Sequence, residues 1–161
     1  MCGIVGYTGQ QSAAPILLEG LKKLEYRGYD SAGIAVMKDG TIAVSKVTGR
    51  IAGLEEKTQN GALLPGTTGI GHTRWATHGA PTEPNAHPHT SNDGRFAVVH
   101  NGIIENYLEL RQELMAKGYR FESETDTEVV VHLVEMYYRG DLMKAVMQTS
   151  ARLRGSYALG I

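Results

Sequence analysis

The spacing of apolar and polar residues predicts short strands interleaved with helices. Between residues 12 and 25, apolar side chains recur at the spacing of an amphipathic helix. Two β-rich runs flank Lys38-Asp39-Gly40, and Asp-Gly between such runs favours a tight hairpin. The same reasoning predicts strands at residues 2–8, 32–37, 41–47, 68–74, 96–100 and 156–161, and helices at 12–25, 50–59, 105–117, from 125 onward and 141–153.

Residues 75–94 form the longest stretch without a predicted element. Prolines and glycines interrupt it repeatedly, and a loop of this length in a compact domain usually carries function or is disordered. Paired strands at both ends of the chain, with helices between them, indicate an α+β fold of antiparallel sheets covered by helices. Because the strand at 156–161 stops without a turn, we expect the chain to be a fragment.

Composition narrows the classes of protein that fit. The 161 residues suffice for one domain with a sizeable core, and an apolar content of 42% is that of a globular protein. A formal net charge of -1 gives no indication of a nucleic-acid partner, and no apolar run is long enough to span a membrane. A single cysteine excludes an internal disulfide, and the N-terminus lacks the features of a secretory signal, so we expect a cytoplasmic location.

The single cysteine, Cys2, occupies an unusual position. If Met1 is removed, Cys2 carries both a thiol and a free α-amine, and the amine's reference pKa is about 7.7–8.0. Such an amine can take the thiol proton and return it to a leaving group, so one residue would supply nucleophile and base. From position alone, a small apolar residue at the start of a strand is the simpler interpretation.

Six segments of the sequence favour the catalytic interpretation of Cys2. They occur in the order CGIVGY (2–7), LEYRGYDSAGIAV (24–36), GHTRWATHG (71–79), NAHPH (85–89), HNGIIENY (100–107) and SETDTEVVVHLV (123–134). Together they closely resemble the glutaminase domain of the glucosamine-6-phosphate synthases (glutamine–fructose-6-phosphate aminotransferases), which are amidotransferases of the N-terminal-nucleophile class. The resemblance covers essentially the whole chain.

The resemblance implies a fold and an activity. The fold would be the four-layer αββα sandwich of N-terminal-nucleophile hydrolases. The activity would be hydrolysis of L-glutamine to L-glutamate and ammonia through a Cys2 thioester, with no cofactor. In the full enzyme, expected to be a homo-oligomer, ammonia would convert fructose 6-phosphate to glucosamine 6-phosphate. On this resemblance the sugar-phosphate isomerase domains would be absent from residues 1–161 and the family's domain would run past residue 161, so we expect an incomplete glutaminase domain, truncated at its C-terminus.

Free glutamine presents two charged α-groups and a neutral amide. Arg74 offers a guanidinium fork for the carboxylate, although a surface role is open from the residue alone. Asp126 lies in a predicted capping box in which Thr125 is the cap, which frees Asp126 for the α-ammonium. Asn101 and Gly102 offer a side-chain amide and a backbone N–H to an oxyanion, although Asn-Gly is most often a plain turn. The resemblance assigns these residues to substrate binding and to the oxyanion hole, respectively.

Further residues are assigned by the resemblance. Trp75 would belong to a loop that closes over glutamine and gates ammonia, and Thr77 and His78 would contact the substrate. Arg27 and Asp30, in YRGYDSAG, would hold the N-terminus in place.

Three alternatives are open. A glutaminase domain serving a phosphoribosyl acceptor is disfavoured by the YRGYDSAG and TRWATHG segments. A non-catalytic binding module of the same fold would be expected to lack one of Cys2, Arg74, Asn101 or Asp126, and all four are present. A metal-dependent hydrolase is disfavoured because the histidines show no zinc-site spacing, so no metal site is predicted.

Overall fold

The protein is described by a computed structural model that covers residues 2–75 and 79–161. Strands and helices alternate along the chain much as the apolar pattern predicts. In chain order the elements are β1 (Gly3–Thr8), α1 (Ala13–Leu24), the short 3₁₀ helix η1 (Glu25–Arg27), β2 (Ser31–Lys38), β3 (Thr41–Thr48), α2 (Ile51–Lys57), β4 (Thr68–Arg74), β5 (His89–Thr90), β6 (Ala97–Gly102), α3 (Tyr107–Ala116), α4 (Glu128–Tyr137), α5 (Leu142–Ser150) and β7 (Tyr157–Gly160).

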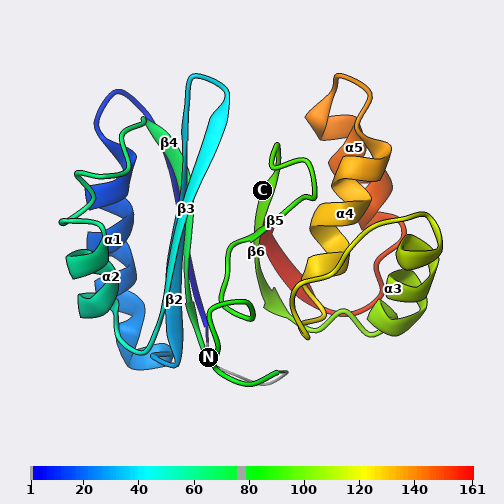
Figure 1. The fold of residues 1–161 in the computed structure, drawn as a ribbon, viewed down its shortest axis with the longest axis horizontal. Helices are drawn as coiled ribbons and strands as arrows, with labels where there is room; N and C mark the ends of the chain where they lie inside the picture. Colours follow the sequence, from blue (N-terminus) through cyan, green and yellow to red (C-terminus); the bar gives the residue numbers. More distant parts are fainter. Residues whose placement is uncertain (1, 76–78) are drawn as a thin grey trace.

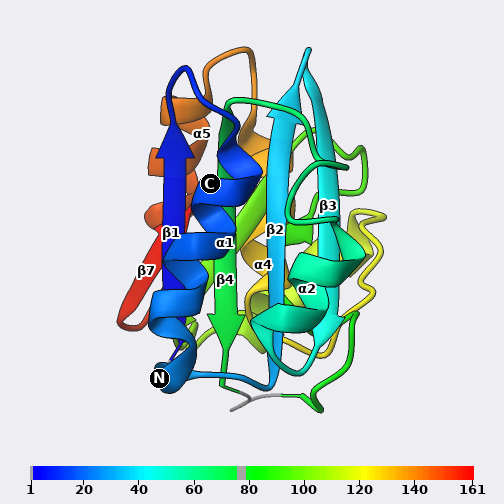
Figure 2. The same cartoon turned by 90° about the vertical axis from the view of Figure 1, so that its left-hand side faces the viewer.

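These elements form four layers (Figure 1). The first sheet has the strand order β1-β4-β2-β3 and the second has the order β5-β6-β7, and every pairing is antiparallel. Helices α1 and α2 cover the outer face of the first sheet (Figure 2), and α3, α4 and α5 lie on the outer side of the second. The predicted α+β class and the αββα sandwich are therefore confirmed.

Strand β4 shows how the sequence builds these layers. Successive side chains in a strand point to opposite faces, and Gly69 and Gly71 face α1: a Cβ on either would lie 2.9 Å from a leucine side chain of that helix. The glycines thus let α1 pack closely on the sheet. The alternate residues Ile70, His72 and Arg74 consequently face the second sheet, where the chemistry lies.

Each sheet has its own apolar core on its helix side. Leu17, Leu21 and Ile34 are fully buried between the first sheet and its helices. Leu114, Leu133 and their neighbours form the corresponding core under the second sheet. Nothing in the described ranges, 2–75 and 79–161, is a helix with the length and hydropathy that a membrane span requires.

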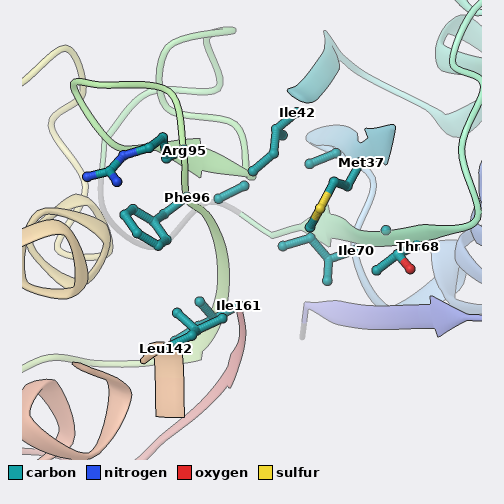
Figure 3. A pocket seen from close by; sticks show the side chains of 11 residues that line it. Met37, Ile42, Thr68, Ile70, Arg95, Phe96, Leu142 and Ile161 are labelled. Carbon is teal, nitrogen blue, oxygen red and sulfur yellow. The ribbon is translucent and has the colours of Figure 1, made fainter. Parts of the chain in front are cut away.

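The space between the sheets differs at its two ends. At the end where β4 begins, Met37, Ile42 and Ile70 face Phe96 and Ile161 across an apolar cavity of about 100 Å³ (Figure 3). At the end where β4 finishes, polar side chains fill the space. The apolar cavity is the larger of the two, but it contains neither Cys2 nor any acid, so the chemistry belongs to the polar end.

Two local predictions are wrong. Residues 75–94 are not entirely irregular, because β5 pairs with β6 and Ser91 closes the connection: its Oγ accepts from the Phe96 N–H at 3.0 Å. The capping box is also wrong, since α4 begins at Glu128 after Thr127. The Glu128 carboxylate instead accepts the backbone N–H groups of Glu122 and Ser123, each at 2.8 Å, and thereby caps the preceding loop.

Candidate active site

The strand register places Cys2 beside Arg74 and Trp75. Gly3 pairs with Thr73 in the antiparallel β1–β4 ladder, so the residue before Gly3 meets the end of β4. The Trp75 N–H donates to the Cys2 Sγ at 3.2 Å, and the sulfur lies 3.6 Å from the Trp75 carbonyl oxygen. A backbone hydrogen-bond donor is thus directed at the atom that would act as the nucleophile.

Asn101 connects the second sheet to Cys2. It lies near the end of β6, and its Nδ2 donates to the Cys2 carbonyl oxygen at 3.2 Å. Its Oδ1 lies 2.8 Å from the Nε2 of His72, which is fully buried on β4. The Asn-Gly pair is therefore the end of a strand that packs against the nucleophile, and the plain-turn interpretation is wrong.

Gly102 occupies a position that only glycine tolerates. Its φ is 118°, and a Cβ would lie 2.1 Å from the Ser156 carbonyl oxygen. Backbone conformations of this kind exclude side chains. The chain can therefore run close along β7 and still leave Gly102 lining the same pocket as Cys2.

Arg74 is a buried cation that lines this pocket. Its guanidinium donates to the carbonyl oxygens of Gly79 and Ala80, at 3.1 and 3.3 Å, and so anchors the loop that follows β4. Burial lowers the pKa of Arg74, while the nearby charges of Cys2, Asp30 and Asp126 oppose that shift. A guanidinium in this setting keeps its charge and is suited to an anionic ligand.

Asp126 lines the same pocket as Arg74. Its Oδ2 accepts the Ile104 N–H at 2.8 Å, and its side chain is 6% exposed. Thr125, which was predicted to be the helix cap, instead bonds His89 Nε2 at 3.0 Å and the Ser123 hydroxyl at 2.9 Å. The predicted reason for Asp126 being available is therefore wrong, although the carboxylate does line the pocket with Cys2 and Arg74.

The remaining predicted site residues are Asp30, Arg27, Trp75, Thr77 and His78. The Asp30 N–H donates to the Arg74 carbonyl oxygen at 3.0 Å, and its charge acts on the Arg74 guanidinium, so Asp30 supports Arg74. Arg27 ends η1 and is half-buried. The Trp75 indole is 44% exposed and packs edge-on against Tyr29, with ring centroids 5.5 Å apart. Thr77 and His78 lie outside the described residues.

Four buried histidines form a polar seam that the sequence pattern did not predict, and three of them line the pocket. His72 stacks on His87 with centroids 4.2 Å apart, and His87 is also in ring contact with His89 and His100. Burial lowers the pKa of His72 to about 4 and that of His89 to about 3, so both are neutral near pH 7. Within residues 2–75 and 79–161, no group of three or more histidine, cysteine or acidic side chains is arranged to hold a metal ion.

A signal for His72 was present in the sequence. His72 and Arg74 are two positions apart in a predicted strand, so their side chains share a face. His87, Thr127 and His100 also line the pocket, but they come from three separate segments whose approach no local pattern indicates.

The pocket combines the groups that amide hydrolysis requires. A thiol can attack an amide carbon, an amide N–H beside it can stabilise the resulting oxyanion, and a cation and an anion that line one pocket can hold a zwitterion. The described residues of the pocket thus suit acyl transfer from a small amino acid amide.

Comparison with known proteins agrees with this geometry. Residues 72–161 match the family described as glutamine amidotransferase domain. The whole chain is 58% identical to a glutamine–fructose-6-phosphate aminotransferase [isomerizing] from Clostridium tetani, 60% identical to that of Clostridium perfringens and 58% identical to that of Aquifex aeolicus. It covers 26%, 26% and 27% of their lengths, so it spans about a quarter of the curated relatives it matches.

Solved structures extend the comparison to the fold. The glutamine phosphoribosylpyrophosphate amidotransferase from B. subtilis, complexed with ADP and GMP, superposes with a TM-score of 0.85 at 29% identity, over 99% of this chain and 34% of that chain. A second structure, described as the allosteric regulatory enzyme of purine biosynthesis, gives a TM-score of 0.83 at 32% identity, with the same coverage.

Proposed function

This chain belongs to the glutamine amidotransferase domain family, and from that premise we propose that it hydrolyses L-glutamine to L-glutamate and ammonia with Cys2 as the nucleophile. The observation that carries the proposal is the convergence of Cys2, Arg74, Gly102 and Asp126 on one pocket, although they come from segments far apart in sequence. Arg74 would hold the glutamine α-carboxylate and Asp126 its α-ammonium. The side-chain amide would then lie toward Cys2.

The first half-reaction forms a thioester. After removal of Met1, the α-amine of Cys2 takes the thiol proton, and the sulfur attacks the side-chain carbonyl carbon of glutamine. The carbonyl oxygen becomes an oxyanion. An amide nitrogen carries two hydrogens, so Asn101 Nδ2 keeps one hydrogen for this oxyanion beside its bond to the Cys2 carbonyl oxygen. The ammonium then returns its proton to the leaving nitrogen, the C–N bond breaks and ammonia departs.

The second half-reaction releases glutamate. A water molecule gives a proton to the α-amine as its oxygen attacks the thioester carbon, and the C–S bond breaks. The proton returns to sulfur, which restores the thiol. The Trp75 N–H directed at Sγ stabilises the sulfur as a leaving group. The half-exposed Trp75 indole would close over the pocket, Thr77 and His78 would add contacts, and Arg27 and Asp30 would support the N-terminal end of the site.

We assign the ammonia to a sugar-phosphate acceptor in the whole protein. Relatives at 58–60% identity are named for fructose 6-phosphate, and this chain corresponds to about a quarter of their length. A phosphoribosyl acceptor is the second candidate, because the superposed amidotransferases share the fold, but their identity of 29–32% gives it less support. Residues 1–161 are proposed to be the glutaminase part of a cytoplasmic, homo-oligomeric enzyme.

The test concerns Met1 and Cys2 together. A retained Met1 would turn the α-amine of Cys2 into an amide, which has no useful basicity. We therefore expect glutamate release and Cys2 alkylation by a diazoketone analogue of glutamine only in molecules whose intact mass lacks Met1. Cys2→Ala should abolish both, while Lys144→Ala, on an exposed helix end, serves as the control. Full activity in molecules that carry Met1 would refute the N-terminal-nucleophile assignment.

A further inference from the structure

We propose that His72 is a positioning residue for this reaction: its Nε2–H fixes the Asn101 amide with Nδ2 toward Cys2. The proposal rests on the proposed function, because Asn101 is there assigned to the oxyanion hole. It adds a residue whose effect passes entirely through Asn101, since no described contact joins the His72 ring to Cys2.

The tautomer of His72 follows from its partners. Its Nε2 lies 3.0 Å from the His100 carbonyl oxygen and 2.8 Å from Asn101 Oδ1. A backbone carbonyl can only accept a hydrogen bond. Nε2 must therefore carry the hydrogen, because the His100 carbonyl oxygen needs a donor whichever way the Asn101 amide is turned.

This tautomer in turn determines the amide. Oxygen and nitrogen of an asparagine side chain are exchanged by a half-turn, and only the surrounding hydrogen bonds distinguish them. If Asn101 were turned, its NH₂ group would face the Nε2–H of His72 at 2.8 Å, and two donors would meet. The oxygen therefore faces His72, and the NH₂ group faces Cys2, whose carbonyl oxygen it meets at 3.2 Å.

The His72 ring is itself held in place. It is fully buried and stacks on His87, with planes inclined by 29°. His87 is tied to β6, because its Nδ1 accepts the His100 N–H at 3.3 Å, and its Nε2 lies 3.3 Å from the Thr127 hydroxyl. The backbone of β6, the strand that carries Asn101, thus anchors both rings through His100.

The second ring nitrogen of His72 indicates what an imidazole contributes at this position that a phenyl ring would not. Its Nδ1 is buried and has no hydrogen-bond partner among residues 2–75 and 79–161. An unsatisfied buried polar atom costs stability, and a phenyl ring would avoid that cost. What the imidazole contributes in return is the Nε2–H donor. Because burial keeps the ring uncharged, it supplies this donor without adding a cation beside Arg74.

Substitutions of His72 distinguish the effect of the Nε2–H donor from the effect of the aromatic ring. His72→Phe keeps an aromatic ring but removes the donor, so we expect kcat for glutamate release to fall roughly tenfold to a hundredfold, below the 10²–10³ typical of losing an oxyanion-hole donor outright. KM for glutamine should change less than threefold, since Arg74 and Asp126 remain. His72→Gln can place an amide N–H near the Nε2 position and should recover most of kcat. A kcat for His72→Gln no better than that of His72→Phe would overturn the proposal.

A double-mutant cycle tests whether the effect passes through Asn101. In an Asn101→Ala background nothing is left to position, so His72→Phe should lower kcat by less than twofold. The same fold-loss in both backgrounds would show that His72 acts independently, which contradicts the proposal.

The parent chain offers a test that needs neither activity nor a variant. Long-range ¹H–¹⁵N correlation spectra at pH 7 report which imidazole nitrogen carries hydrogen, and we expect the Nε2–H form for His72. The Nδ1–H form would overturn the proposal even if glutamine is hydrolysed. Conversely, an Nε2–H form in a chain that releases no glutamate would refute the proposed function and leave the amide orientation supported.

Discussion

At the residue scale, substrate recognition depends on two opposite charges that the fold places on the walls of one pocket. Arg74 reaches it from the end of β4, and Asp126 from the loop before α4. Each is buried, so a ligand group that pairs with either is shielded from water, and the pairing is stronger than at an exposed site.

We therefore expect the two residues to discriminate between different parts of glutamine. Arg74→Ala should lower kcat/KM for glutamine by roughly tenfold to a hundredfold, the range for losing a hydrogen bond to a charged group. It should barely affect 4-aminobutanamide, which lacks the α-carboxylate. Asp126→Asn should show the complementary pattern with glutaramate, which lacks the α-amine. The measurement is kcat/KM for each variant with each amide.

The matched control is Arg95→Ala, which removes an exposed arginine at the opposite end of the inter-sheet space. It should leave all three substrates unchanged. Equal losses for glutamine and for both truncated amides in the Arg74 and Asp126 variants would show that these residues support the fold rather than recognise the α-groups.

At the element scale, α5 provides a clear case of a predicted cap. Asp141 accepts the Lys144 N–H at 3.1 Å, as its place before an apolar run predicts. Asp141→Ala should lower the free energy of unfolding by about 1 kcal/mol. Lys144→Ala removes only the exposed ion pair to Asp141 and should change it by less than about 0.5 kcal/mol. Urea unfolding of the parent and both variants gives the comparison, and equal losses would assign the effect to the ion pair.

The contrast between α5 and α4 shows where local patterns fail. Both sequences begin with an acidic or hydroxyl residue before apolar positions, yet only Asp141 caps its own helix. The hydroxyl groups of Thr125 and Thr127 are drawn instead to histidines of the seam, which come from other elements. Tertiary partners thus overrode a local preference worth about 1 kcal/mol.

At the scale of the whole molecule, the histidine seam links stability to pH. Burial lowers the pKa values of His72, His87 and His89 from 6.5. Just below pH 6.5 these histidines therefore stay neutral in the folded chain but take up protons in the unfolded chain. The free energy of unfolding should therefore fall as pH drops from about 6.5 toward 5, by up to about 1.4 kcal/mol per pH unit for each such histidine.

Urea unfolding at several pH values measures this slope. His89→Gln removes one titrating group from the seam but keeps a side chain able to reach Thr125. The free energy of unfolding of this variant should therefore depend less steeply on pH, by up to about 1.4 kcal/mol per pH unit. A slope in the parent chain near zero, or one that His89→Gln leaves unaltered, would contradict the assignment of uncharged buried histidines.

Local sequence patterns predicted most of the elements and the candidates for the site. Periodicity located the strands and main helices, because each must bury one face, and the Asp39-Gly40 turn follows from two positive φ values that this dipeptide accommodates. The chemistry of glutamine and the family motifs singled out Cys2, Arg74, Asn101 and Asp126 as candidates, since few residue types can supply a nucleophile, a carboxylate fork or an amide donor.

The partners that hold those groups follow from the packing of the two sheets. The bond from the Trp75 backbone to sulfur, the donor from His72 to Asn101 and the stacking of the histidines all join residues of different elements. Such contacts depend on strand register and on two sheets packing face to face, and register is a long-range property that local spacing does not encode. The short strand β5 was not predicted for the same reason. Two residues are too few to show an alternating pattern, and β5 is defined only by its pairing with β6.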